Sequence, residues 1–260
     1  MNPSGHAILL KGLTFGYGAA GPVVLEDISM EIPPRSVTAI LGPNGSGKTT
    51  LLRLLLGLLV PRKGDILLVG KPKDHYSPKE MKQLIGLVPQ EESIPFDLSV
   101  IEYVLLGRAP HLRLLALPKE EDLRIALESL ESIGLAGLQD RLLPSLSGGE
   151  RQLVTIARAL AQETTILLMD EPTSHLDLAN RRRVLQVMRA LGDMGKTILF
   201  TTHDPNAAAA VADHAIMLRG GRVLAAAPVG EAFTSKNLSD TYGVGVEVIQ
   251  IRNRPIVLPL

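Results

Sequence analysis

Apolar and polar residues form blocks along the chain that predict strands and helices in turn. Residues 37–41 and 166–169 are short apolar runs typical of fully buried parallel strands. Apolar and polar residues alternate over residues 28–32, which predicts a half-buried antiparallel strand, and residues 8–15 are expected to pair nearby. Helical patterns occupy residues 49–59, 123–133 and 178–191. This succession favours an α/β fold.

Strand signals stop after residue 90 and return near residue 165, with a helical pattern between them. We therefore expect an α/β core made of residues 1–90 and 146–260, with a helical subdomain inserted at residues 91–145. Further short strands are predicted at residues 65–69, 85–88, 196–201, 215–218, 223–225 and 244–251. The segment 230–260 either adds a strand layer or takes part in subunit contact. Three capping boxes predict helix starts, at Ser77 with Glu80, Ser99 with Glu102, and Ser147 with Glu150.

The composition of the chain limits the partners and sites that the protein can have. Lys plus Arg and Asp plus Glu number 27 each, so no net charge favours nucleic acid or anionic lipid, and we expect no nucleic-acid partner. Cysteine is absent, which excludes disulfides and thiolate metal sites. Residues 1–5 do not resemble a secretion signal, and the longest apolar run, at residues 51–60, is interrupted by Arg53 and too short to span a bilayer. We expect a cytosolic protein that reaches membranes through a partner.

Residues 42–50 match the phosphate-binding pattern G-x-x-x-x-G-K-[ST], between a predicted buried strand and a predicted helix. The glycines allow backbone N–H groups to wrap a phosphate, Lys48 supplies positive charge to the β and γ oxygens, and the Thr49 hydroxyl can bind Mg²⁺. A glycine-rich turn that matches by chance is the alternative, and the strand–loop–helix context argues against it. A nucleoside triphosphate is expected at Gly42, Pro43, Asn44, Gly45, Ser46, Gly47, Lys48, Thr49 and Thr50.

Two adjacent carboxylates, Asp170 and Glu171, follow the apolar run at residues 166–169. The carboxyl end of a buried parallel strand is where α/β sheets bind ligands. Asp170 is suited to hold a metal ion through water, and Glu171 is suited to polarise an attacking water as general base. A solvated strand-to-helix turn is the alternative interpretation. The phosphate-binding motif earlier in the chain favours the functional one.

A second candidate anion site begins the helix predicted after residue 147. Gly148 and Gly149 leave the first-turn N–H groups unobstructed, next to the capping box of Ser147 and Glu150. Taken alone, this is only a good helix start. However, one nucleotide does not require two phosphate-binding ends. The second one makes sense if it serves the nucleotide of another subunit.

With these motifs in place, the sequence resembles the ATP-binding cassette (ABC) ATPases over nearly its whole length. Residues 146–152, LSGGERQ, match the family signature, with Glu150 in place of the commoner Gln. The resemblance implies a P-loop NTPase of the ABC ATPase fold: a mainly parallel core sheet, an N-terminal antiparallel β subdomain and an inserted helical subdomain. It also implies that Tyr17 stacks on adenine and that Gln90 reaches the metal and the attacking water. Asp177 then belongs to the loop that crosses the dimer, and His203 is the switch histidine.

The resemblance further implies ATP hydrolysis by two copies that face head to tail and sandwich two MgATP. The catalytic residues are then Glu171, His203, Lys48 and Gln90. The residues expected to bind Mg²⁺ are Thr49, Gln90 and Asp170. The residues expected to contact the nucleotide held by the other copy are Ser147, Gly148, Gly149 and Glu150, with Asp177 near the dimer crossing.

A finer resemblance concerns cargo. Residues 104–111, VLLGRAPH, look like the GR-x-PH segment of importers for iron-siderophore, haem and cobalamin. In that group the surface between Gln90 and Arg113 accepts a cytoplasmic helix of a multi-span permease dimer, and an extracytoplasmic substrate-binding protein acts indirectly. The resemblance therefore implies a protein peripheral to the inner face of the membrane. The plain alternative is that residues 100–106 pack the helical insert and that Arg108 is solvated.

Two other functions remain open from the sequence. One is the ATPase of a molybdate- or tungstate-type importer of the same group. The other is a soluble ABC ATPase in a non-transport complex, such as iron–sulfur cluster assembly. The sequence does not select the cargo, the oligomeric state of the isolated chain, its turnover or its regulation.

Overall fold

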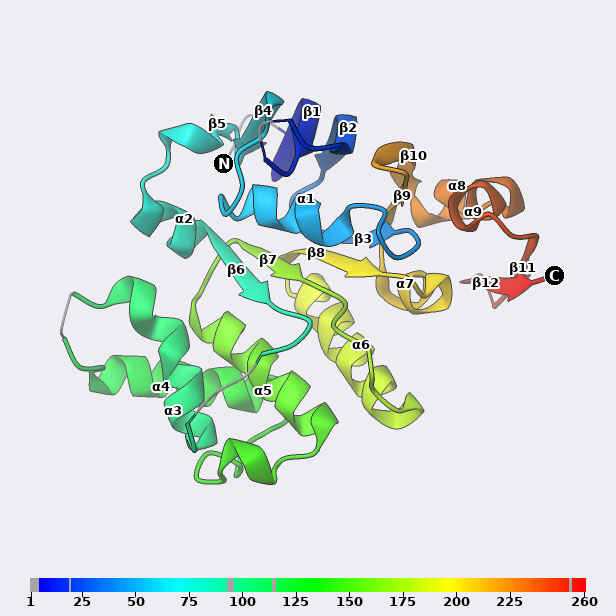
Figure 1. Cartoon of the computed structure of the whole chain (residues 1–260). Coiled ribbons are helices and arrows are strands. Elements are labelled where there is room, and N and C mark those ends of the chain that lie inside the picture. The colour runs from blue at the N-terminus through cyan, green and yellow to red at the C-terminus, as the bar shows by residue number, and fades with distance from the viewer. Residues whose placement is uncertain (1–4, 19, 93–95, 114–115, 253) are drawn as a thin grey trace. The chain divides into compact units, whose positions relative to one another are not determined.

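The computed structural model describes residues 5–18, 20–92, 96–113, 116–252 and 254–260 (Figure 1). The expectation about a secretion signal therefore falls mostly outside the described residues, and so do residues 93–95 of the predicted permease-binding segment. The chain forms two compact units, Met1–Tyr76 with Met188–Leu260, and Ser77–Val187. Each unit is described by itself below. The functional division at residues 91–145 stays a prediction.

An antiparallel sheet opens the first unit. Its strands lie in the order β2-β1-β4-β5 (Figure 1). The side chains of β2 alternate between buried and exposed toward its end, as expected for a sheet with one covered face. This confirms the predicted N-terminal antiparallel pairing. The bounds are β1 Ile8–Gly16, β2 Val23–Ile32, β4 Lys63–Leu68 and β5 Lys71–Pro72.

Parallel strands form the centre of the first unit. Strand β3 (Val37–Leu41) pairs in parallel with β8 (Thr197–Thr202) and with β9 (His214–Arg219), and β9 pairs antiparallel with β10 (Arg222–Pro228). Every residue of β3 and β8 is buried. Strands buried on both faces read as apolar runs, which is why the sequence predicted them.

The helices of the first unit are short, and the chain ends in a hairpin. Helix α1 was predicted to reach residue 59 but ends at Leu55, because Gly57 adopts a φ of 75° that an α-helix cannot contain. Helices α7, α8 and α9 and the last strand of the hairpin are present although the sequence pattern did not predict them. The bounds are α1 Lys48–Leu55, α7 Pro205–Val211, α8 Val229–Ala232, α9 Ser235–Tyr242, β11 Val246–Ile251 and β12 Arg254–Pro259.

The second unit combines a parallel strand pair with a helical cluster. Strands β6 (Ile85–Val88) and β7 (Ile166–Met169) pair in parallel. Helices α3, α4 and α5 contact one another and bury Val104, Leu130 and Leu153. All three predicted capping boxes are confirmed, at the starts of α2, α3 and α5. The bounds are α2 Pro78–Leu84, α3 Val100–Leu105, α4 Glu120–Ser132 and α5 Gly148–Ala161, and α6 spans Leu178–Asp193.

Within the described ranges, no helix has the length and apolar character needed to cross a membrane.

Arg108 is buried, so the alternative of a solvated Arg108 is wrong. Its Nε donates to the Asp122 carboxylate at 3.0 Å, and its Nη1 donates to the carbonyl of Ala161 at 2.7 Å and to Glu163 at 2.6 Å. The neighbouring His111 Nε2 lies 2.9 Å from the carbonyl of Gln162. The GR-x-PH segment therefore binds the last carbonyls of helix α5 and the start of α4.

Replacing Arg108 with Leu is expected to destabilise the protein by about 3 kcal/mol, because it leaves the nearly buried Asp122 carboxylate without its cation. The matched control is Arg124→Leu on α4, since Arg124 pairs with Glu121 and Glu128 at the exposed surface, where ion pairs contribute only about 0–1 kcal/mol. Urea-induced unfolding of the two variants measures the difference. Equal losses of stability would contradict a structural role for the buried pair.

Candidate functional site

The predicted phosphate loop lies between the buried strand β3 and helix α1. Gly47, at the start of α1, has a φ of 105°, which side chains other than glycine rarely adopt. A Cβ at Gly42 would lie 2.1 Å from the carbonyl oxygen of Leu218 on β9, so only glycine fits there. The loop conformation thus depends on its glycines, as the motif predicted.

Lys48 and Ser46 place buried polar atoms within this loop. The Nζ of Lys48 donates to the carbonyls of Gly42 at 2.9 Å and Pro43 at 3.1 Å, and the residue is 5% exposed. The hydroxyl of Ser46 is buried and has no hydrogen-bond partner among the described residues. Buried polar atoms are normally paired. An anion with several acceptor oxygens fits both groups.

Tyr17 lies beside the end of the phosphate loop. Its hydroxyl is 3.1 Å from the hydroxyl of Thr50, and its ring packs edge-on against Phe15 at a centroid distance of 5.0 Å. The residue is 46% exposed, so part of the ring stays accessible. This position is compatible with stacking on a base whose phosphates occupy the loop.

His203 leaves the sheet next to the phosphate loop. Strands β3 and β8 are parallel neighbours, and Leu41 pairs with Thr202. The residues that follow the paired ones, Gly42 and His203, therefore emerge at the same sheet edge. The first unit therefore brings together the phosphate loop, Tyr17 and His203, which the sequence assigned to one site.

In the second unit, Gln90 and Asp170 also emerge at one sheet edge. Val88 pairs with Met169, and the N–H of Asp170 donates to the carbonyl of Val88 at 2.9 Å. Gln90 lies two residues beyond Val88, and Asp170 lies directly after Met169. Amide and carboxylate oxygens at one edge are suitable ligands for a hard cation such as Mg²⁺.

Glu171 has an unusual backbone conformation, with a φ of 44°. Non-glycine residues adopt such angles rarely and at some energetic cost. The amide and the hydroxyl of Ser174 both donate to the carbonyl of Glu171, at 3.0 and 2.9 Å, and hold the turn. The strained backbone at Glu171, the predicted general base, therefore favours a functional role for this residue.

The signature residues begin helix α5 with a charged capping box. The amide and hydroxyl of Ser147 donate to the Glu150 carboxylate, each at 2.8 Å, and these bonds hold the pKa of Glu150 below its ordinary value. The amide of Glu150 donates in return to the Ser147 hydroxyl at 3.3 Å. Ser147 and Gly148 are exposed, so a ligand can reach this helix end.

Asp177 is coupled to the signature helix through Asn180. The Asp177 carboxylate accepts hydrogen bonds from the backbone amide of Asn180 at 2.8 Å and from its side-chain amide at 2.9 Å. A Cβ at Gly149 would lie 2.1 Å from the Asn180 side chain. The second unit therefore connects two predicted interface elements that lie far apart in sequence. Sequence spacing gave no signal of the role of Asn180.

Comparison with known proteins assigns the family. The ABC transporter family matches residues 25–174, which include the phosphate loop, Gln90, the signature and Glu171. The chain belongs to the ABC transporter family.

Curated relatives of this ABC protein cover almost its full length. It is 39% identical over 251 residues to the ferric enterobactin transport ATP-binding protein FepC of Escherichia coli (strain K12), covering 95% of this chain and 92% of the relative. It is 35% identical over 262 residues to the hemin import ATP-binding protein HmuV of Photobacterium damselae subsp. damselae, covering 98% and 97%. The predicted family resemblance is confirmed.

Solved structures confirm the predicted fold. An inward-facing ABC transporter of the metal-chelate type matches with a TM-score of 0.86 and 35% identity, over 99% of this chain and 98% of that chain. The ATP-binding cassette MJ0796, a dimer in a post-hydrolysis state with ADP and Pi, matches with a TM-score of 0.73 and 31% identity, over 85% and 98%.

Gly149→Ala is expected to lower stability by about 1–3 kcal/mol, because the added methyl group displaces an Asn180 side chain that Asp177 holds in place. The matched control is Gly148→Ala, where a Cβ meets nothing within 4 Å and an alanine in a helix is expected to be neutral or slightly stabilising. Thermal unfolding of both variants measures the effect. Equal melting temperatures would show that Gly149 is not sterically required.

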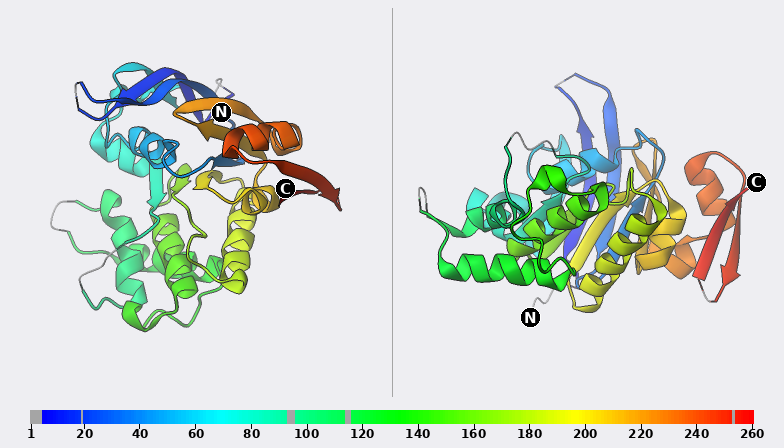
Figure 2. Two further views of the ribbon diagram at one scale, coloured as in Figure 1. Left: turned by 45° about the vertical axis from the view of Figure 1, so that its right-hand side comes forward. Right: turned by 90° about the horizontal axis from the view of Figure 1, so that it is seen from below.

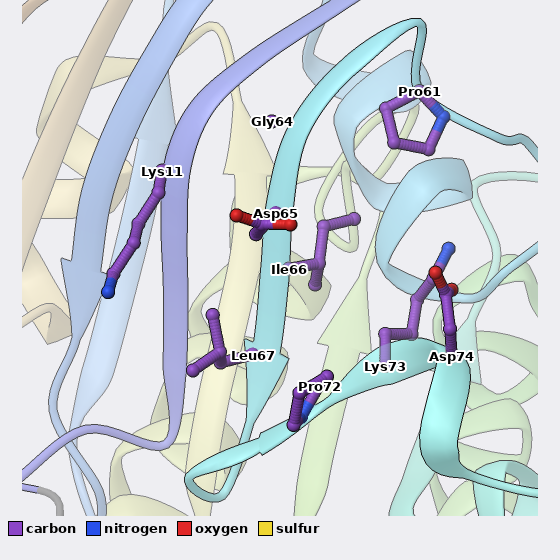
Figure 3. Close-up of a pocket in the computed structure, with 9 residues that line it drawn as sticks. All are labelled: Lys11, Pro61, Gly64, Asp65, Ile66, Leu67, Pro72, Lys73 and Asp74. Carbon is purple, nitrogen blue, oxygen red and sulfur yellow. The ribbon is translucent and has the colours of Figure 1, made fainter.

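A separate pocket of about 330 Å³ lies along β4 and β5 (Figure 3). Its lining includes Lys73, whose Nζ donates to the carbonyl of Leu54 in the last turn of α1 at 3.3 Å and whose pKa is lowered by burial. None of the predicted site residues lines it. Lys73 therefore helps to cap α1, and the ATP-site assignment does not involve this pocket.

Proposed function

We propose that this protein is the ATP-hydrolysing subunit of an importer for metal chelates such as iron-siderophore, haem or cobalamin. The observation that carries the proposal is the strand register. In each unit it puts the predicted phosphate-binding or hydrolytic residues at the ends of paired parallel strands. Similarity to FepC and HmuV over nearly the whole chain supports the importer class.

The phosphate loop binds the triphosphate of ATP in this proposal. The backbone N–H groups of residues 42–50 surround the phosphates, since the glycines leave them unobstructed. Lys48 exchanges its carbonyl acceptors in the loop for phosphate oxygens, and the Ser46 hydroxyl gains a partner. The exposed Tyr17 ring stacks on adenine.

The three candidate metal ligands suit Mg²⁺. Thr49 offers a hydroxyl, Gln90 an amide oxygen and Asp170 a carboxylate, and Mg²⁺ commonly takes few protein ligands beside phosphate oxygens and water. When bound, the ion would neutralise phosphate charge.

Hydrolysis needs a base and a group that stabilises charge on the γ-phosphate. Glu171 takes the proton from the attacking water, whose position Gln90 helps to fix. His203 and Lys48 donate hydrogen bonds to the γ-phosphate oxygens as negative charge shifts toward the leaving group. The proton ends on the Glu171 carboxylate, and the products are ADP and phosphate.

The signature residues serve the nucleotide of a second copy. Residues 147–150 present the positive end of the α5 dipole, and the exposed Ser147 adds a hydroxyl that a γ-phosphate can reach. Asp177 lies at the dimer crossing. The dimeric state of the cassette MJ0796 supports this arrangement for a relative of the same family.

A multi-span permease dimer is the second partner, and it holds the protein at the inner face of the membrane. Its cytoplasmic helix contacts the surface between Gln90 and Arg113, while buried Arg108 supports that surface from below. An extracytoplasmic binding protein delivers the cargo to the permease and does not contact this chain.

The test of this partner class is affinity purification of the Glu171→Gln variant, with MgATP, from native membranes solubilised in mild detergent. Mass spectrometry is expected to identify a multi-span permease. Recovery of only soluble proteins, from membranes shown to retain other transporter complexes, would replace the importer proposal with a non-transport ABC ATPase. The ATP-site residues would keep their assignment in that case.

A further inference from the structure

The C-terminal hairpin of β11 and β12 lies beside helices α7 and α9 in all views (Figure 1 and Figure 2). Val248 pairs with Val257, and the N–H of Leu260 donates to the carbonyl of Gly245 at 2.9 Å. In an antiparallel pair, hydrogen-bonded and non-hydrogen-bonded positions alternate. The backbone nitrogens of residues 255, 257 and 259 therefore face away from β11.

This outer edge of β12 offers one N–H group. Residues 255 and 259 are prolines, which have no N–H, and prolines commonly protect exposed strand edges. Only Val257, between them, can donate. Its N–H donates to Oδ1 of Asn206 at 2.9 Å, and Nδ2 of Asn206 donates to the carbonyl of Val257 at 3.0 Å. The Asn206 amide thus pairs with the strand through both of its polar atoms.

The opposite edge of the hairpin is fixed to α9. The N–H of Val246 donates to the hydroxyl of Ser239, and the N–H of Val248 donates to the hydroxyl of Ser235, each at 3.0 Å. The hairpin consequently links α9 to α7. Side chains of Ser235 and Ser239 bind one backbone edge of the hairpin, and the side chain of Asn206 binds the other. None of the family motifs described above lies in this hairpin.

Asn206 lies three residues after His203. Between them, the Asp204 carboxylate accepts hydrogen bonds from the amides of Asn206 at 2.9 Å and Ala207 at 3.2 Å, and so caps α7. Helix α7 has only seven residues, and its buried side chains are Ala207, Ala208 and Val211. Such small side chains bury little apolar area. The two hydrogen bonds of the Asn206 amide therefore add to the anchoring that these small side chains provide.

We infer that Asn206 is a positioning residue: by clamping α7 to Val257 of the C-terminal hairpin, it holds His203 where the switch histidine acts. This inference rests on the proposed function of His203. It gives the C-terminal segment a role in catalysis within one chain.

The test compares Asn206→Leu and Val257→Pro in the complex with the co-purified permease. The first variant removes both polar atoms at similar size. The second removes the outward N–H without removing a bond to β11, and it replaces the buried Val257 side chain with a proline ring. Each is expected to lower kcat for ATP about 3- to 10-fold, the worth of one or two hydrogen bonds, and to leave KM within about twofold. Since both variants break one contact, the double variant is expected to be no slower than the slower single variant.

Val248→Pro is the matched control, because it removes the corresponding N–H on the α9 edge of the same hairpin. Its kcat is expected to stay within about twofold of wild type. Equal losses in Val248→Pro and Val257→Pro would overturn the Asn206 contact in favour of general hairpin stability. Unchanged kcat in both Asn206→Leu and Val257→Pro would overturn the inference, as would effects that multiply in the double variant.

His203→Ala separates this inference from the proposed function. Loss of hydrolysis in His203→Ala with normal hydrolysis in Asn206→Leu and Val257→Pro would overturn the positioning role alone. Wild-type hydrolysis in His203→Ala would overturn both.

Discussion

Glu171→Gln is expected to slow ATP hydrolysis by about 10²- to 10⁴-fold, the usual worth of a positioned general base. Glutamine keeps the size and hydrogen-bonding reach of glutamate, but its amide does not accept a proton from water at neutral pH. ATP binding is expected to persist, because the phosphate loop is unchanged. A closed dimer with ATP should therefore accumulate. Phosphate release and size-exclusion chromatography with MgATP measure the two effects.

Glu131→Gln is the matched control for this variant, since Glu131 is an exposed glutamate at the end of α4. Its hydrolysis rate should equal that of the wild type. Full activity in Glu171→Gln would show that another group is the base, and the strained turn at Glu171 would then need a different explanation.

Lys48→Ala is expected to weaken ATP binding by about 10- to 100-fold, because a charge-assisted contact to phosphate contributes roughly 1.5–3 kcal/mol. The buried Nζ also bridges the carbonyls of Gly42 and Pro43, so its loss leaves these carbonyls without that donor. Equilibrium binding of a fluorescent ATP analogue measures the loss.

The control for Lys48→Ala is Arg53→Ala, which removes an exposed cation from the same helix α1. Its affinity for the analogue should match that of the wild type. If both variants bind the analogue equally tightly, Lys48 is not a phosphate ligand and the phosphate-loop assignment fails.

The parts of the fold that the sequence predicted well are those determined by local chemistry. The capping boxes at Ser77, Ser99 and Ser147 each need only residues three positions apart, and all three form as expected. The buried strands β3 and β7 are apolar because both of their faces are covered. The phosphate loop follows from β3 and its glycines.

What the sequence did not predict depends on contacts between distant residues. Arg108 is buried because Asp122 and Glu163 lie 14 and 55 positions away and neutralise it, a pairing that spacing does not reveal. Strand β12 was missed because Pro255 and Pro259 read as strand breakers, yet both occupy the edge that lacks ladder bonds. Helix α7 was missed because its run of alanines shows no amphipathic period.

ATP hydrolysis by this protein is expected to drive the uptake of a metal chelate. The most direct measurement is accumulation of radiolabelled ferric siderophore, haem or cobalamin in proteoliposomes that contain this protein and its co-purified permease, with MgATP on the side of this protein and the binding protein outside. One of the three is expected to accumulate with wild-type protein and not with Glu171→Gln. ATP-dependent uptake of molybdate or tungstate, with none of the three chelates transported, would contradict it.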